Sequence, residues 1–164
     1  MQLEKQKTYL LLGSNLGDRK LYLNNALKLI AEEVGEIKLR SSTYETAAWG
    51  KTDQPGFLNI AVEVETNLAP LALLKTLLGI EEYLGRIREE KWGARLIDID
   101  IILYGNEIVT LANELQIPHP EMQNRKFVME PLAEIAPDLI HPVLQKSVSE
   151  ILTTLTDTLP VSKI

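Results

Sequence analysis

Two aspartates separated by one isoleucine are the side chains of this chain best suited to chemistry. Asp98 and Asp100 lie in the apolar run Leu96–Ile102. Residues two apart in a β-strand share a face, so both carboxylates would project from one side and the isoleucines from the other. Carboxylates among apolar residues are costly to desolvate unless a positive charge meets them, and Mg²⁺ prefers such oxygen ligands. Mg²⁺ is therefore the candidate ligand of this pair, and paired carboxylates can hold two such ions that clamp a phosphate group.

A bare Asp-x-Asp motif is common, and its alternative interpretation is a solvated strand face that pairs with arginines. Trp92, Gly93 and Arg95 just before the pair, and the apolar residues on both sides, favour the metal site. A group of four arginines is the next candidate, because the planar guanidinium group of arginine suits bidentate contact with phosphate. Each arginine alone is better explained as surface charge beside glutamates, but as a cluster near the acidic pair they predict phosphate binding. These arginines are Arg86, Arg88, Arg95 and Arg125.

His119 is the third candidate, because Pro118 and Pro120 on either side could aim its ring into a site. Alone it would be interpreted as a loop histidine with a local hydrogen bond. His141 is expected to be structural. The segment Gly13–Gly17 lies between a strand and a helix, but it matches neither the Walker A nor the Rossmann pattern. An ordinary tight connection is the simpler interpretation of that segment.

The elements that must position these residues follow from hydrophobic periodicity and from turn and cap residues. Alternation of apolar and polar residues predicts five strands, and apolar residues spaced three or four apart predict four helices. Pro131 is expected to limit the third helix. The fourth helix is expected to begin with a capping box of Ser147 and Glu150. The order β-α-β-β-α-β predicts an α+β fold, a ferredoxin-like sandwich with C-terminal helical additions, in one domain over residues 1–164. The predicted strands are 8–12, 37–43, 57–66, 96–104 and 107–110, and the helices 19–34, 70–84, 128–135 and 148–155.

Composition narrows the classes of function. The chain has 164 residues, no cysteine, a net charge of −6 and a pI near 5.0. These values disfavour a disulfide scaffold and a nucleic-acid binder, which needs a basic face. No apolar run reaches the roughly 18 residues of a membrane span, and the start of the chain is too polar for a secretory signal. We expect a cytoplasmic protein, monomeric, without nucleic-acid or membrane partners.

Taken together, the motifs resemble those of the 6-hydroxymethyl-7,8-dihydropterin pyrophosphokinase family. The resemblance extends from Gly13 to about Pro142 and is most specific over Lys91–Ile102. The family carries prolines after the threonine of its substrate loop where this chain has Ala47 and Ala48. The other matching segments are Gly13–Gly17, Gln54–Asn59, Gly85–Arg88, Ile117–Pro120 and Asn124–Phe127.

The resemblance implies a role for each site residue. Asp98 and Asp100 would hold two Mg²⁺ ions and, with Arg86 and Arg88, carry catalysis. The pterin would lie between Phe57 and Phe127, with Asn59 on its edge. The remaining pterin contacts would be Thr46, Ala47 and Trp49, and the ATP contacts Glu81, Arg86, Arg88, Trp92, Arg95, Ile101, His119 and Arg125.

The activity implied by the resemblance is transfer of the β,γ-diphosphate of ATP to a hydroxymethyl-dihydropterin in folate synthesis, with release of AMP. Two other classes stay open at this point. A metal-dependent nucleotidyl transferase or phosphodiesterase also uses paired aspartates on a strand, and a non-catalytic ferredoxin-like binding module could carry them as a solvated face.

Overall fold

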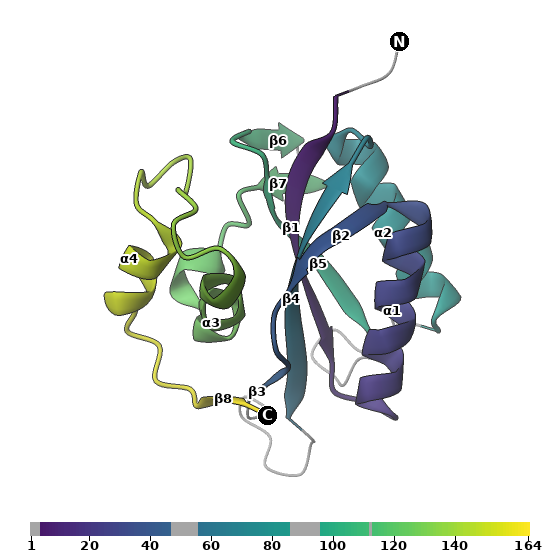
Figure 1. Cartoon of the computed structure of the whole chain (residues 1–164), viewed down its shortest axis with the longest axis horizontal. Coiled ribbons are helices and arrows are strands. Elements are labelled where there is room, and N and C mark those ends of the chain that lie inside the picture. Colours follow the sequence, from purple (N-terminus) through teal and green to yellow (C-terminus); the bar gives the residue numbers. More distant parts are fainter. Residues whose placement is uncertain (1–3, 47–55, 86–95, 112) are drawn as a thin grey trace.

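The computed structural model describes residues 4–46, 56–85, 96–111 and 113–164. An antiparallel sheet stands between two layers of helices (Figure 1). The strands are β1 (Gln6–Ser14), β2 (Gly35–Arg40), β3 (Tyr44–Thr46), β4 (Phe57–Thr66), β5 (Asp98–Tyr104), β6 (Val109–Leu111), β7 (Leu115–Ile117) and β8 (Val161–Lys163); the helices are α1 (Arg19–Glu33), α2 (Pro70–Tyr83), η1 (Met122–Asn124), α3 (Lys126–Ile135) and α4 (Val148–Thr153).

The main sheet has the strand order β5-β1-β4-β3-β8, and β2 also pairs with β4. β2 and β3 both lie along the same edge of β4. β2 pairs with the second half of β4, and β3 pairs with the first residues of β4. β6 and β7 form a separate hairpin beside β5. The central strands β1 and β4 are buried on both faces along most of their length, and most of their buried side chains are apolar.

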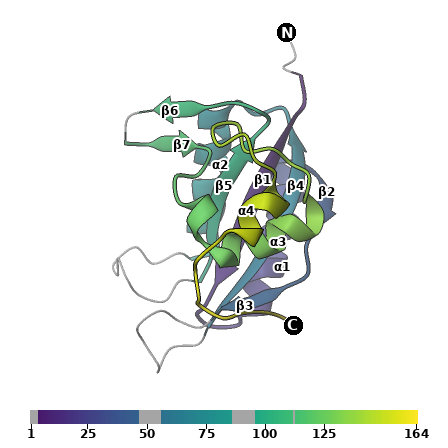
Figure 2. The same cartoon turned by 90° about the vertical axis from the view of Figure 1, so that its left-hand side faces the viewer.

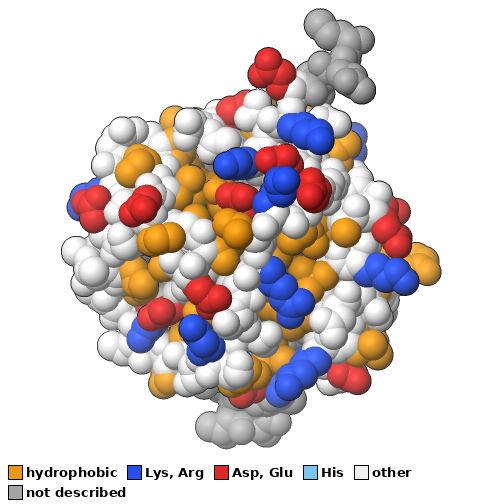
Figure 3. All heavy atoms as spheres, in the orientation of Figure 1, with side chains coloured by type: hydrophobic (Ala, Val, Ile, Leu, Met, Phe, Trp, Pro, Cys, Tyr) orange, Lys and Arg blue, Asp and Glu red, His pale blue; other side chains and the backbone are white. Residues whose placement is uncertain are grey.

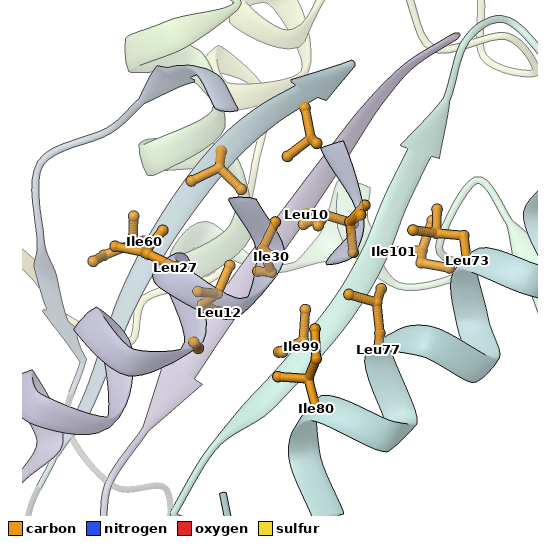
Figure 4. Packing of buried hydrophobic residues seen from close by; sticks show 14 of the residues in the cluster. Leu10, Leu12, Leu27, Ile30, Ile60, Leu73, Leu77, Ile80, Ile99 and Ile101 are labelled. Atoms are coloured by element: carbon orange, nitrogen blue, oxygen red, sulfur yellow. The ribbon is translucent and has the colours of Figure 1, made fainter. Parts of the chain in front are cut away.

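The first face of the sheet packs against α1 and α2 (Figure 4). Leu27 and Ile30 of α1, and Leu73, Leu77 and Ile80 of α2, lie over isoleucines and leucines of β1, β4 and β5. Asp18 caps α1, since its Oδ1 accepts the backbone N–H of Leu21 at 3.1 Å. Helices α1 and α2 therefore cover the first face of the sheet.

The second face packs against α3 and α4, which Figure 2 shows in front of the strands. The buried residues Tyr9, Leu11 and Ala61 meet Val128 and Met129 of α3 there. The helices cover this face only in part, because Asp100 on the same face of β5 is exposed. In the view of Figure 3, acidic and basic side chains are interspersed over the surface without a broad basic patch.

The predicted strands and helices are largely confirmed, but several bounds differ. The predicted strand 37–43 lies over β2, which begins at Gly35 and ends at Arg40, because Ser41 Oγ accepts the N–H of Ala61 at 2.9 Å and so interrupts the backbone pairing before β3. β3 itself, from Tyr44 to Thr46, lies where no strand was predicted. Helix α3 begins at Lys126 and continues past Pro131, with Leu132 buried. β7 and β8 are too short for their sequences to indicate them.

None of the described helices is both long and apolar enough to cross a membrane.

Candidate functional site

A row of directly opposite residues crosses the sheet at the end of β1. Gly13 pairs with Asn59 of β4 on one side and with Asp98 of β5 on the other, and Asn59 pairs in turn with Tyr44 of β3. Directly opposite residues of antiparallel strands project from the same face. Because neighbouring strands lie about 4.8 Å apart, Asp98 and Asn59 are about 10 Å apart with only a glycine between them. The second face therefore carries an acid and an amide on either side of a buried glycine.

The absence of a side chain at Gly13 creates room for the Asn59 amide. A Cβ at position 13 would lie 2.7 Å from Asn59 Nδ2. That nitrogen donates to the carbonyl of Leu12 at 3.3 Å, whereas Asn59 Oδ1 is buried and has no partner among the described residues. Thr46 Oγ1, one pair further along the same face, is also buried and also has no hydrogen-bond partner among the described residues. Buried polar atoms are normally hydrogen-bonded, so these two indicate a polar ligand.

The acidic pair lies as its spacing predicts. Asp98 is partly buried and Asp100 exposed, on the face opposite to the buried Ile97, Ile99 and Ile101. Glu81 of α2 lies on the other side of β5, where its Oε2 accepts the N–H of Ile99 at 2.7 Å. Since β5 is the edge strand of the sheet, this carboxylate satisfies a backbone group that has no neighbouring strand.

Two carboxylates on an accessible strand face fit a Mg²⁺ ion that keeps waters and shares its remaining positions with phosphate oxygens. Among the described residues no group of three or more acidic or histidine side chains could hold a metal ion. The donor set therefore fits a metal that arrives with a phosphorylated ligand better than a closed structural site.

His119 lies against the edge of β5 as a neutral donor. Its backbone N–H donates to the carbonyl of Ile102 at 3.0 Å, and its Nδ1 accepts the N–H of Glu121 at 3.2 Å. The proton of the neutral ring is therefore on Nε2. Burial lowers the pKa of His119, and the positive charge of Arg125 lowers it further. A ring of this kind can donate a hydrogen bond at pH 7 without carrying charge.

Both histidines are expected to titrate below pH 6.5. Burial also lowers the pKa of His141, whose Nδ1 accepts the N–H groups of Val143 and Leu144. A lowered pKa in the folded state means that the unfolded state binds more protons, so the stability from these rings is present above pH 6.5 and is lost as pH falls toward the folded pKa. The chain has two histidines, so NMR titration of the ring protons resolves both. A pKa of 6.5 or above for either ring would contradict the described contacts.

The structure brings together most of the described residues among the candidates. Phe57 and Asn59 lie on the face of β4 that α3 covers, with Thr46 beside them. Phe127 is partly buried at the start of α3, and the guanidinium of Arg125 lies 5.7 Å from the centre of its ring. Ile101 differs, because its side chain is buried in the core of the opposite face. The candidates Ala47, Trp49, Arg86, Arg88, Trp92 and Arg95 lie outside the described residues.

Two residues of this region were missed by the sequence analysis. Gly13 was interpreted as part of an ordinary connection, although a glycine at the end of a buried strand is a signal of close approach. Arg19 was not considered. Its Nη1 lies 2.6 Å from Glu45 Oε2 and 2.7 Å from the carbonyl oxygen of Gly56, so it joins the end of β3 to the start of β4.

Gly13→Ala is expected to weaken ligand binding at Asn59 about tenfold, the effect of one lost hydrogen bond, while the fold survives. The new methyl group would displace the far end of the Asn59 side chain, which can move. Gly79→Ala is the matched control, since no atom lies within 4 Å of a Cβ there. Titration with the pterin proposed below, together with thermal unfolding, measures both effects. Unchanged affinity for Gly13→Ala would show that Asn59 does not contact the ligand.

An accessible acidic pair and unsatisfied polar atoms lie on one sheet face, and a neutral imidazole donor lies at the edge of β5. Together they indicate an enzyme of the phosphate-transferring class. The chain belongs to the 7,8-dihydro-6-hydroxymethylpterin-pyrophosphokinase family, whose model matches residues 9–137.

Individual relatives agree with the family match. The chain is similar to the 2-amino-4-hydroxy-6-hydroxymethyldihydropteridine pyrophosphokinases of Methylorubrum extorquens, with 47% identity over 82% of this chain and 85% of the relative, and of Aquifex aeolicus, with 43% identity over 87% and 88%. Among solved structures it resembles the wild-type HPPK-DHPS of Plasmodium falciparum crystallised with pteroate, with a TM-score of 0.78. That match has 19% identity and covers 93% of this chain but 43% of the Plasmodium chain, so it shows the fold alone.

Proposed function

We propose that this protein transfers the β,γ-diphosphate of ATP to the hydroxymethyl group of 6-hydroxymethyl-7,8-dihydropterin, releasing AMP, as a step of folate biosynthesis. Family membership supports the reaction. The structural observation that carries it is the row formed by Asp98, Gly13 and Asn59. It holds an acidic pair and an unsatisfied amide about 10 Å apart on one face, a separation that fits phosphates at one end and a flat heterocycle at the other.

On the pterin side, the described residues offer two rings and two polar atoms. We assign Phe57 and Phe127 to the faces of the heterocycle, because aromatic rings on both sides supply stacking energy. Asn59 Oδ1 and Thr46 Oγ1, which have no partner among the described residues, would bond its polar edge. Ala47 and Trp49 stay candidates for further contacts to the pterin.

On the ATP side, Asp98 and Asp100 would hold Mg²⁺, of which we propose two ions. Bound Mg²⁺ neutralises phosphate charge and acts as a Lewis acid on the phosphoryl oxygens. We assign the Nε2–H of His119 and the guanidinium of Arg125 to phosphate oxygens, because the backbone of His119 bonds to Ile102 of β5 and the charge of Arg125 is near enough to lower the pKa of His119. Glu81 and Ile101 stay candidates for the adenosine side; Arg86, Arg88, Trp92 and Arg95 stay candidates for closing over the phosphates.

In the proposed reaction the hydroxymethyl oxygen forms a bond to the β-phosphorus, and the bond from that phosphorus to the oxygen of AMP breaks. The chain contributes chiefly by positioning the two substrates in line and by stabilising charge, as in other phosphoryl transfers. No described side chain is assigned as the base that accepts the hydroxyl proton.

Family membership disfavours the two alternative classes, and the nucleotide product separates the pyrophosphokinase from each of them. We expect protein, Mg²⁺, ATP and 6-hydroxymethyl-7,8-dihydropterin to give AMP, and to give none when the pterin is left out. ADP would indicate an ordinary kinase. Pyrophosphate would indicate a nucleotidyl transferase, and no nucleotide turnover a binding module. Ion-exchange chromatography of the mixture distinguishes these outcomes.

The finer description of the fold is part of this proposal. The strands β5, β1 and β4 lie in this antiparallel order, and β2 and β3 both pair with the free edge of β4. Helices α1 and α2 cover one face of the sheet. This arrangement supports a ferredoxin-like core within one domain of residues 1–164. α3 and α4 are the C-terminal additions to it. The cytoplasmic location and the monomeric state stay predictions.

A further inference from the structure

The C-terminal tail after α4 runs from the start of α3 to the edge of β3. Its course is visible in yellow in Figure 1, where β8 lies beside β3 far from α4. The family model ends at residue 137, so the match assigns this tail no role. Its two points of contact, Asp157 and β8, fall next to the two walls of the proposed pterin site.

The first point of contact is the N-terminus of α3. Asp157 Oδ2 accepts the backbone N–H of Lys126 at 3.1 Å, and its Oδ1 accepts the N–H of Leu159 at 3.0 Å. The N-cap residue of α3, Arg125, makes no side-chain capping bond of its own. Asp157 therefore supplies from the tail the acceptor and the negative charge that helix N-termini favour. Lys126 is flanked by the two site residues Arg125 and Phe127.

The second point of contact is β3. β8 pairs with all three residues of β3, with Val161 opposite Thr46, and the N–H of Ile164 donates to the carbonyl of Thr43 at 2.9 Å. Without β8, a three-residue β3 would be the exposed edge of the sheet. Thr46 is the last residue of β3 and pairs with Phe57 on its other side. The position of Thr46 thus depends on β8 as well as on β4.

Glu134 of α3 joins this helix to the second point of contact. Its Oε1 accepts the hydroxyl of Tyr44 at 2.6 Å and lies 3.7 Å from Lys163 Nζ, while its Oε2 accepts the N–H of Ser42 at 2.8 Å. Burial alone would raise the pKa of Glu134, but these hydrogen bonds and the charge of Lys163 lower it, so it is ionised at pH 7. One carboxylate therefore fixes α3, β3 and β8 relative to one another.

We propose that the tail Asp157–Ile164 is a positioning element of the pterin site, which sets the separation between the Phe127 wall on α3 and the Thr46 and Phe57 wall on β3 and β4. This inference rests on the proposed function. A tail that served stability alone would change the melting temperature and the fraction of active protein, but would leave the KM of properly folded enzyme unchanged. A positioning element changes the KM for the pterin in folded enzyme.

Ser162→Pro tests the β3 wall, because proline removes a backbone N–H and disrupts strand pairing. Ser162→Ala is its matched control, since Ser162 is exposed and alanine keeps the backbone. We expect Ser162→Pro to raise the KM for the pterin at least fivefold, with kcat and the KM for ATP within twofold of the wild type. Ser162→Ala is expected to behave as the wild type. All constants are measured at least 15 °C below the melting temperature of each variant.

Asp157→Ala tests the α3 wall and remains informative if Ser162→Pro does not fold. It is expected to raise the KM for both substrates, because Lys126 lies between Phe127 and Arg125, and Asp157→Asn, which keeps an acceptor oxygen, should restore part of the loss. Asp138→Ala removes an exposed carboxylate just beyond the other end of α3 as control. Unchanged KM for the pterin in both tail variants would overturn the proposal. A wild-type protein that forms no AMP would contradict the proposed function instead, before any variant is compared.

Discussion

Asp98→Asn and Asp100→Asn are each expected to lower AMP formation by about 100- to 1000-fold, the range found when one electrostatic contact to a transition state is removed. Asparagine keeps the shape of the side chain but removes the charge that binds Mg²⁺. The triphosphate would then meet a protein that is still acidic, with a net charge of −5 in place of −6, and with weaker metal neutralisation. A remaining carbonyl oxygen allows some activity at high Mg²⁺ concentration.

Both variants should keep the fold, since Asp98 and Asp100 lie on the accessible face of β5 while the isoleucines beside them are buried. Their melting temperatures are expected to equal or slightly exceed that of the wild type, because like charges on one strand face repel. Glu114→Gln, an exposed residue between β6 and β7, is the control for loss of one charge. A stable variant with near-normal AMP production at saturating ATP would exclude the paired carboxylates as the metal site.

Phe127→Ala is expected to weaken pterin binding by about 1–3 kcal/mol, the value of one stacked aromatic ring, or roughly 5- to 150-fold. ATP binding should change far less, since only the cation–π contact to Arg125 is lost on that side. Calorimetric titration with each ligand separately measures the difference.

Tyr83→Ala provides the control for this substitution, because Tyr83 is a ring on α2, whose buried side chains pack against the opposite face of the sheet, and it is 80% exposed. It should leave pterin binding unchanged. Equal losses for both ligands in Phe127→Ala would contradict the assignment of this ring to the pterin and would point to a general disturbance of α3.

The sequence could predict the acidic face because strand alternation is a local property. Ile97, Ile99 and Ile101 had to share a side with each other, so Asp98 and Asp100 had to share the other. The cap of the last helix was equally local, because Ser147 accepts the backbone bond that its position indicates. Sequence patterns of this kind require no knowledge of the partner strands.

What the sequence could not predict depends on register between distant segments. Gly13 lies between Asn59 and Asp98 only because β1 pairs with both β4 and β5, and these two residues are 46 and 85 positions from Gly13 along the chain. Asp157 caps a helix that begins 31 residues earlier, and no capping pattern near Lys126 indicates it. The contact of Glu134 with Tyr44 could not be predicted either, because the two residues are 90 positions apart along the chain.

The mass of the pterin product tests the central claim most directly. After incubation with Mg²⁺ and ATP, the account predicts that 6-hydroxymethyl-7,8-dihydropterin gains two phosphoryl groups in one turnover, in amounts equal to the AMP released. Mass spectrometry of the purified pterin, with ³¹P NMR to show two coupled phosphorus atoms, provides the measurement. A pterin that carries one phosphoryl group or an adenylyl group, or that is unchanged while ATP is consumed, would contradict the account.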